Sequence, residues 1–243
     1  MSDLVQPMTE RLLRDAGIGA GMKVLDVGCG PGTVSRMAAS LVGPDGLVVG
    51  LDRSRAVIER AQAAAGVNQR FVVGELLNPP AGPFDAVVGR RVLMYQPDVI
   101  EALAALREVL VPGGLAVFQE HDATSLSADE RFPLHQEVHR WLWTTIERED
   151  ANPAMGLRLP QALVAAGFDV HQVRAEAVVQ TKSQRHVTVE IVRAMISRIV
   201  AQGVATEAEI DLPALDTRLA EELSDAPYVG ELVVGVWARP RFL

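Results

Sequence analysis

The fold is decided at residues 24–33, which read VLDVGCGPGT. An apolar run ends at three alternate glycines, Gly28, Gly30 and Gly32, and this pattern is typical of a buried strand followed by a tight loop and a helix. Glycines leave the backbone open to close approach by a ligand, and the amides at the start of the next helix lie nearby. The stretch therefore predicts a ligand-binding loop in an α/β fold.

Strand and helix patterns alternate after this loop. Ser54 is a candidate helix N-cap. Repeated strand-helix-strand units require parallel strands, which bind ligands at their carboxyl ends. The sequence thus predicts a doubly wound, mostly parallel, seven-stranded Rossmann-like sheet. One apolar helical stripe is expected at Ile100, Leu103, Leu106 and Leu110. The strands are expected at residues 23–27, 47–51, 71–73, 84–88, 115–118, 170–179 and 232–237, and helices at 33–41, 54–65 and 100–110. The strands at 23–27, 71–73 and 84–88 are expected to be buried.

The later part of the chain is richer in helix patterns. We expect a single domain over residues 1–243, whose core at 20–122 is the cofactor-binding half. Helical insertions at 123–157 and 183–226 are expected to roof the substrate site. The additional helices are expected at residues 128–150, 158–166, 187–202 and 217–223.

Composition and charge narrow the class of partner. The formal net charge of -8, with basic residues scattered along the chain, disfavours binding to a nucleic acid. Residues 1–21 carry acidic side chains and no continuous apolar stretch, so we expect neither a membrane anchor nor a secretory signal. The only cysteine is Cys29, which suits a reducing cytoplasm. A small-molecule partner is the expectation that remains.

Two carboxylates flank the glycine loop. Asp26 lies inside the first strand, where a carboxylate is costly unless it meets a donor or a positive charge such as a ligand ammonium group. Asp52 ends the second strand, where it could accept both hydroxyls of a ribose. Dinucleotide-binding proteins prefer a third glycine at the position of Thr33, so the spacing disfavours a nicotinamide-dependent oxidoreductase.

Together, Asp26, the three glycines and Asp52 resemble the first two motifs of class I S-adenosylmethionine-dependent methyltransferases. The resemblance implies that S-adenosylmethionine is the cofactor, and we assign Arg53 to the same site. Gly74-Glu75-Leu76 is similar to the family's third-strand motif, with Glu75 in place of the usual aspartate.

By that likeness Glu75 and Leu76 are expected to contact the adenine. Residues 84–90 resemble the fourth-strand motif, which places Arg90 near the methionine part of the cofactor. Residues 106–114 are similar to the segment that leads into the family's fifth strand. The resemblance covers about residues 20–122.

The candidate catalytic residues follow the fifth strand. His121 is the candidate general base, with Glu120 or Asp122 as its orienting partner. The alternative is that these polar residues only cap the end of the strand and form hydrogen bonds with the helical insertions above it. His135 and His139 have a spacing that can bind zinc, but a polar helix face explains them better, so we expect no metal.

The sequence indicates the residues of the substrate pocket less clearly than those of the cofactor site. Aromatic and sulfur side chains at Trp141, Trp143 and Met155 either roof the site or belong to the core. A helical stripe, consistent with a lid or a homodimer interface, is expected at Val187, Ile191, Met195 and Ile199. The function that the resemblance implies is methyl transfer to an O, N or C atom of a small molecule, in a setting such as bacterial secondary metabolism. The alternatives are binding of S-adenosylmethionine without methyl transfer and nicotinamide-dependent oxidation.

Overall fold

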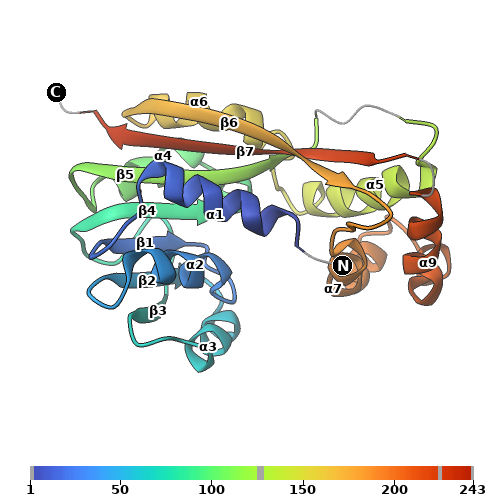
Figure 1. Cartoon of the computed structure of the whole chain (residues 1–243), viewed down its shortest axis with the longest axis horizontal. Helices are drawn as coiled ribbons and strands as arrows, with labels where there is room; N and C mark the ends of the chain where they lie inside the picture. The colour runs from blue at the N-terminus through green and yellow to red at the C-terminus, as the bar shows by residue number, and fades with distance from the viewer. Residues whose placement is uncertain (1–2, 125–128, 224–225, 242–243) are drawn as a thin grey trace.

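The computed structural model describes residues 3–124, 129–223 and 226–241. These residues form a seven-stranded sheet in the order β3-β2-β1-β4-β5-β7-β6 (Figure 1). Strands β1 to β5 pair in parallel, whereas β7 is antiparallel to both β5 and β6. The strands are β1 (Lys23–Val27), β2 (Leu47–Asp52), β3 (Gln69–Val73), β4 (Phe84–Arg90), β5 (Leu110–Asp122), β6 (Phe168–Gln180) and β7 (Tyr228–Pro240). The predicted fold is confirmed.

Helices cover both faces of this sheet because its strands are apolar on both sides. Val24 packs on α1 and α2, whereas its neighbour Leu25 belongs to the core that includes α4 and α6. This split follows from the alternation of side chains along a strand. The covering helices are α1 (Val5–Ala16), α2 (Thr33–Val42), α3 (Arg55–Ala63), α4 (Val99–Arg107) and α6 (Met155–Ala165), with a 3-10 turn, η1, at Leu93–Tyr95.

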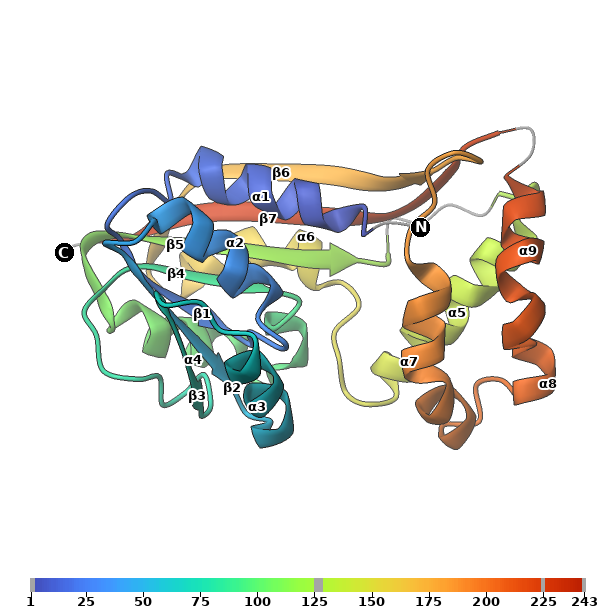
Figure 2. The same cartoon turned by 60° about the horizontal axis from the view of Figure 1, so that its bottom comes forward.

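A separate group of helices lies beyond the carboxyl end of β5 (Figure 2). It contains α5 (Pro133–Glu147), α7 (Thr188–Ala201), α8 (Glu207–Ile210) and α9 (Leu212–Glu222). Within it, α5, α7 and α9 pack on one another. The long strands β6 and β7 reach from the sheet to this group (Figure 1). Helix α6 packs instead on β5, β6 and β7.

Several local expectations are wrong. Strand β3 is at the edge of the sheet, and its Val72 and Val73 are exposed rather than buried. Ile100 is 48% exposed, and Leu110 starts β5 instead of ending a helix. Ser54 precedes α3, but its side chain makes no capping hydrogen bond.

The N-terminal helix α1 was not predicted, and it packs on β5 and β7. The expected helix over 128–150 begins at Pro133, and residue 128 lies outside the described residues. Among the described helices, none has the length and apolar character needed to cross a membrane.

Candidate functional site

The glycine loop joins β1 to α2 in a backbone conformation that favours glycine. Gly28, Gly30 and Gly32 all have positive φ, at 62°, 54° and 82°. A Cβ at Gly28 would lie 2.3 Å from Cγ2 of Val92, whereas one at Gly30 would meet nothing within 4 Å. The loop borders a crevice of about 220 Å³ that Arg90, Arg91 and other residues also line. The open backbone at Gly30 therefore suits contact with a ligand.

Asp52, at the end of β2, is positioned by this loop. Its Oδ2 accepts the Gly30 N–H at 3.0 Å, and its Oδ1 accepts the Ser54 N–H at 2.9 Å. Each carboxylate oxygen can accept more than one hydrogen bond, so Asp52 keeps acceptor capacity for a diol. This arrangement fits the ribose role that the sequence predicts.

Asp26 is buried in β1 beneath the loop. The Ser35 hydroxyl donates to its Oδ2 at 2.5 Å, while its Oδ1 has no partner among the described residues. Burial raises the pKa of Asp26 to about 7, against the opposing effects of Ser35 and of the Arg90 charge. A buried carboxyl oxygen without a donor is costly, and a ligand ammonium group would supply one. The residues around the loop therefore fit the implied cofactor.

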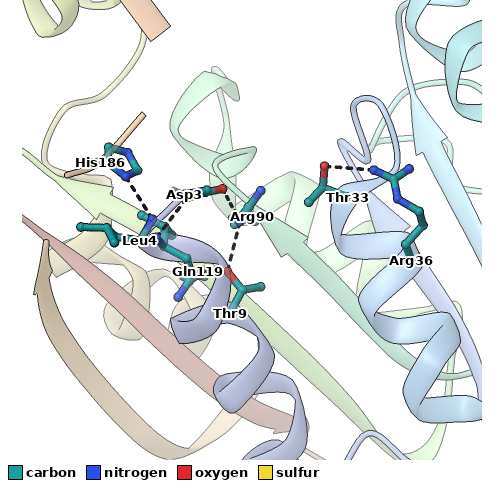
Figure 3. A network of polar contacts seen from close by, with 9 residues as sticks. Asp3, Leu4, Thr9, Thr33, Arg36, Arg90, Gln119 and His186 are labelled. Carbon is teal, nitrogen blue, oxygen red and sulfur yellow. Dashed lines mark hydrogen bonds and ion pairs between the residues drawn. The ribbon is translucent and has the colours of Figure 1, made fainter. Parts of the chain in front are cut away.

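Arg90 ends β4 and is held by the unpredicted helix α1 and the residues before it (Figure 3). Its Nη1 lies 3.3 Å from the Thr9 hydroxyl and 3.9 Å from Oδ2 of Asp3. The Thr9 hydroxyl also lies 2.6 Å from Oε1 of Gln119 on β5. These contacts hold Arg90 beside the glycine-loop crevice, and its nearness to the methionine part of the cofactor stays a prediction.

The remaining predicted cofactor residues lie after β2 and β3. Leu76 is buried, whereas Glu75 and Arg53 are exposed. The Gly74 N–H donates to the Asp52 carbonyl at 3.1 Å, which joins the end of β3 to the end of β2. The adenine contacts of Glu75 and Leu76, and the role of Arg53, stay predictions.

A second cavity, of about 210 Å³, lies between the sheet and the helical group. Arg90 and Arg91 line both this cavity and the glycine-loop crevice. The two cavities are therefore neighbours at these two arginines. The apolar part of the lining includes Val138, Leu142, Trp143, Ile146, Ile191 and Met195.

His121 lines this second cavity from β5. Its Nδ1 lies 3.0 Å from Oε1 of Glu231, and its buried Nε2 has no partner among the described residues. Burial lowers the pKa of His121, and the hydrogen bond with Glu231 offsets this only in part. Because the carboxylate accepts the proton on Nδ1, the neutral ring leaves Nε2 as a proton acceptor.

Glu231 joins two histidines. Its other oxygen, Oε2, pairs with Nε2 of His139, and the His139 ring stacks on Trp143 at 6.0 Å between centroids. Burial opposes ionisation of Glu231, but the hydrogen bonds with His121 and His139 outweigh it and hold its pKa well below the usual range. Sequence reasoning missed Glu231 because no local motif marks it.

The prediction that Glu120 or Asp122 orients the His121 ring is wrong, because Glu231 has this position. Oε1 of Glu120 instead accepts the N–H groups of Val92 and Leu93, at 2.9 and 2.8 Å, at the start of η1. Neighbours on a strand point to opposite faces, so Glu120 and His121 diverge. Asp122 accepts the Leu157 N–H at 2.9 Å, near the start of α6.

The expectations for the two histidines, the aromatic roof and the α7 stripe have different outcomes. Nδ1 of His135 lies 2.7 Å from Oε2 of Glu222, so His135 and His139 are paired with different carboxylates. No cluster of three or more potential metal ligands was found in residues 3–124, 129–223 and 226–241. Trp143 lines the cavity, but Trp141 and Met155 belong to the core. The cavity-lining members of the α7 stripe are Val187, Ile191 and Met195, whereas Ile199 is in the core.

Comparison with known proteins identifies the family of the chain. Residues 18–177 match the family described as "Methyltransferase domain". An uncharacterised 37.1 kDa protein from transposon TN4556 of Streptomyces fradiae is 33% identical over 157 residues, which are 63% of this chain and 45% of that protein. A demethylmenaquinone methyltransferase of Staphylococcus aureus is 34% identical over 121 residues, 48% of this chain and 50% of that protein.

The chain thus aligns with about half the length of these curated relatives. Among solved structures, a putative methyltransferase from Bacillus halodurans superposes with a TM-score of 0.64 and 17% identity. That superposition covers 96% of this chain and 98% of the other. At this identity the likeness concerns the fold alone.

Proposed function

This chain belongs to the class I S-adenosylmethionine-dependent methyltransferase family, and we propose that it methylates a hydroxyl oxygen of a small, largely apolar molecule. The chain is a methyltransferase whose cofactor is S-adenosylmethionine. The observation that carries the proposal is the His121 ring, which lines the second cavity with Nδ1 held by Glu231 and Nε2 without a partner.

The residues that would hold the cofactor are Asp26, the glycine loop, Asp52 and Arg90. When bound, S-adenosylmethionine supplies a methyl group on a sulfonium sulfur. Asp26 would receive the ammonium group at its unpartnered Oδ1, and Asp52 would accept the ribose hydroxyls. The two cavities share Arg90 and Arg91, which supports placing the acceptor in the second cavity, next to the glycine-loop crevice.

A hydroxyl acceptor benefits from a base, unlike an amine, because an alcohol or phenol is a poor nucleophile until its proton leaves. His121 would take that proton at Nε2 as the new oxygen–carbon bond forms and the methyl–sulfur bond breaks, with the electron pair of that bond staying on sulfur in the leaving S-adenosylhomocysteine. Glu231 would hold the ring in the productive tautomer and stabilise the resulting imidazolium. The lowered pKa keeps His121 neutral, and so ready to act as a base, at pH 7.

The lining of the cavity indicates the class of acceptor. Its apolar wall is built from α5 and α7, through side chains such as Leu142, Ile146 and Met195. Such a wall suits a small ring or short chain more than a polymer. The net charge of -8 also opposes a nucleic-acid substrate. The Staphylococcus aureus relative, named for demethylmenaquinone, lends support to a small-molecule acceptor.

The wider setting is part of the same proposal. We place the enzyme in the cytoplasm, because its single cysteine suits a reducing compartment. A role in bacterial secondary metabolism, a homodimer and a single domain with two roofing insertions stay predictions.

The direct test is product analysis. The full chain would be incubated with methyl-labelled S-adenosylmethionine and matched phenols, anilines and enolisable ketones. We expect label in a methyl ether, with a rate that falls at acidic pH. Label on nitrogen or carbon would overturn the hydroxyl proposal. Cofactor binding without transfer to any acceptor would favour the alternative of a protein that binds S-adenosylmethionine without using its methyl group.

A further inference from the structure

Arg91 is a charged side chain that the proposed chemistry does not use. It directly follows β4 and has a φ of 54°, in the left-handed region that residues other than glycine rarely adopt. Its backbone N–H donates to the Gln119 carbonyl at 2.9 Å, which fixes the turn. Backbone strain of this kind gathers at ligand sites, where it aims a side chain.

The guanidinium of Arg91 is less well satisfied than that of Arg90 among the residues that the structure describes. Its Nε is buried without a hydrogen-bond partner among the described residues. Arg90, by contrast, contacts Asp3 and Thr9. The charge of Arg91 also acts on Glu120, but the hydrogen bonds of that carboxyl go to the N–H groups that start η1. A buried guanidinium donor without a partner is costly, and a ligand anion would remove that cost.

The charges of the two arginines differ in which groups they affect most. Beyond the effect of burial, the charge of Arg91 lowers the pKa of His121 and of His186, which both line the second cavity. The charge of Arg90 also lowers the pKa of His121, though less than that of Arg91, and it lowers the pKa of Asp26, which burial raises beneath the glycine loop. Arg91 therefore acts on the second cavity, whereas the charge of Arg90 acts on both cavities.

We propose that Arg91 binds a carboxylate of the methyl acceptor, so that the substrate is a small apolar acid that also carries a hydroxyl group. A planar guanidinium matches a carboxylate through two parallel hydrogen bonds. The rest of the wall, with Leu142, Trp143 and Met195, would cover the apolar body of the acid. This inference rests on the proposed function, because it places the acceptor in the cavity that His121 lines.

The test compares the affinities of aromatic hydroxy acids with those of the corresponding neutral amides. Hydroxybenzoate isomers and hydroxycinnamate, each beside its primary amide, would be titrated by calorimetry into the full chain saturated with S-adenosylhomocysteine. We expect at least one acid to bind at least about 10-fold more tightly than its amide, because a hydrogen-bonded pair of opposite charges is stronger than a neutral hydrogen bond. This comparison needs only the wild-type chain.

Variants then locate the charge. Arg91→Met should weaken binding of the acid by about 10 to 100-fold and leave the amide and S-adenosylhomocysteine within about threefold. Arg91→Lys should recover part of the lost affinity, because lysine keeps the positive charge but cannot make the two parallel hydrogen bonds of a guanidinium. Arg140→Met is the matched control, since Arg140 lies exposed on α5 and pairs with Glu137; it should bind all ligands as the wild type does.

The outcomes separate this inference from the proposed function. Equal affinity for acids and amides, or no binding of any acid, would overturn the carboxylate assignment. Weaker S-adenosylhomocysteine binding in Arg91→Met would assign the guanidinium to the cofactor instead. Tight, Arg91-dependent binding of an acid whose hydroxyl is never methylated would support the carboxylate site and contradict hydroxyl methylation.

Discussion

Oε1 of Glu231 lies 3.0 Å from Nδ1 of His121, although 110 positions separate the two residues in the chain. The antiparallel pairing of β5 with β7 brings them together, with His121 opposite Val233. The carboxylate sets the tautomer of the ring, and its second oxygen engages His139. Glu231 is thus a positioning residue for the proposed base.

Replacing Glu231 by glutamine tests this role. Glu231→Gln keeps the shape but removes the charge that stabilises the imidazolium, so we expect turnover to fall by about 10 to 1,000-fold. The acid limb of the pH–rate profile should move to lower pH, because the hydrogen bond that raises the His121 pKa is weakened. Glu176→Gln, on the neighbouring strand β6 and paired with Arg11, is the matched control and should change neither quantity. An unmoved acid limb would reduce Glu231 to a structural role.

Asp26 is expected to favour function at the expense of stability. Its folded pKa of about 7 lies above the ordinary 3.8, so its contribution to stability is present below pH 3.8 and is lost as the pH rises to about 7. Asp26→Asn should therefore raise the free energy of unfolding at pH 8 by on the order of 1 kcal/mol. The same variant should weaken S-adenosylhomocysteine binding by about 10-fold or more, since the ammonium group loses its carboxylate.

A second carboxylate of the sheet provides the control. Asp85 accepts the Lys23 N–H at 2.7 Å, at the start of β1 and β4, far along the strands from the glycine loop. Asp85→Asn should leave cofactor affinity unchanged. Chemical denaturation and calorimetry on both variants measure the two effects. If Asp26→Asn binds as the wild type does, the ammonium assignment is wrong.

Asp52 has a double role that affects the choice of variant. Asp52→Ala removes the acceptor of both the Gly30 and Ser54 N–H groups, so it disturbs the loop as well as the ribose site. Asp52→Asn keeps one carbonyl acceptor. We expect the asparagine variant to bind S-adenosylmethionine about 10-fold more weakly and the alanine variant about 100 to 1,000-fold more weakly. Equal affinities for all three proteins, measured by calorimetry, would contradict the ribose assignment.

The cofactor half could be predicted from the sequence because its motif is local. Asp26, the glycines and Asp52 lie within one strand-helix-strand unit, where right-handed crossover and parallel pairing fix their relative positions. The same rules place the polar ends of β4 and β5 at one edge. The exposed β3 was misjudged because an apolar edge strand reads like a central one.

The acceptor half depended on contacts that no local pattern shows. Glu231 reaches His121 only through the pairing of β7 with β5, and α1 reaches Arg90 only through its packing on the sheet. The positive φ of Arg91 is likewise set by the fold. Glu120 is different: strand alternation already separates it from His121, so this error could have been avoided.

The last prediction concerns His121 itself. His121→Asn keeps a polar side chain of similar reach near Glu231 but removes the proton acceptor, so we expect turnover to fall by about 100 to 10,000-fold with cofactor affinity nearly unchanged. In the wild type, burial places the His121 pKa below its ordinary 6.5. The rate should therefore be level above that pH and fall as the pH drops through the lowered pKa, because the protonated ring cannot accept the hydroxyl proton. The variant should lose this acid limb. Unfolding curves and S-adenosylhomocysteine titrations must match those of the wild type before rates are compared. A folded variant that retains near-normal turnover would remove His121 from the mechanism and leave alignment of the acceptor as the source of catalysis.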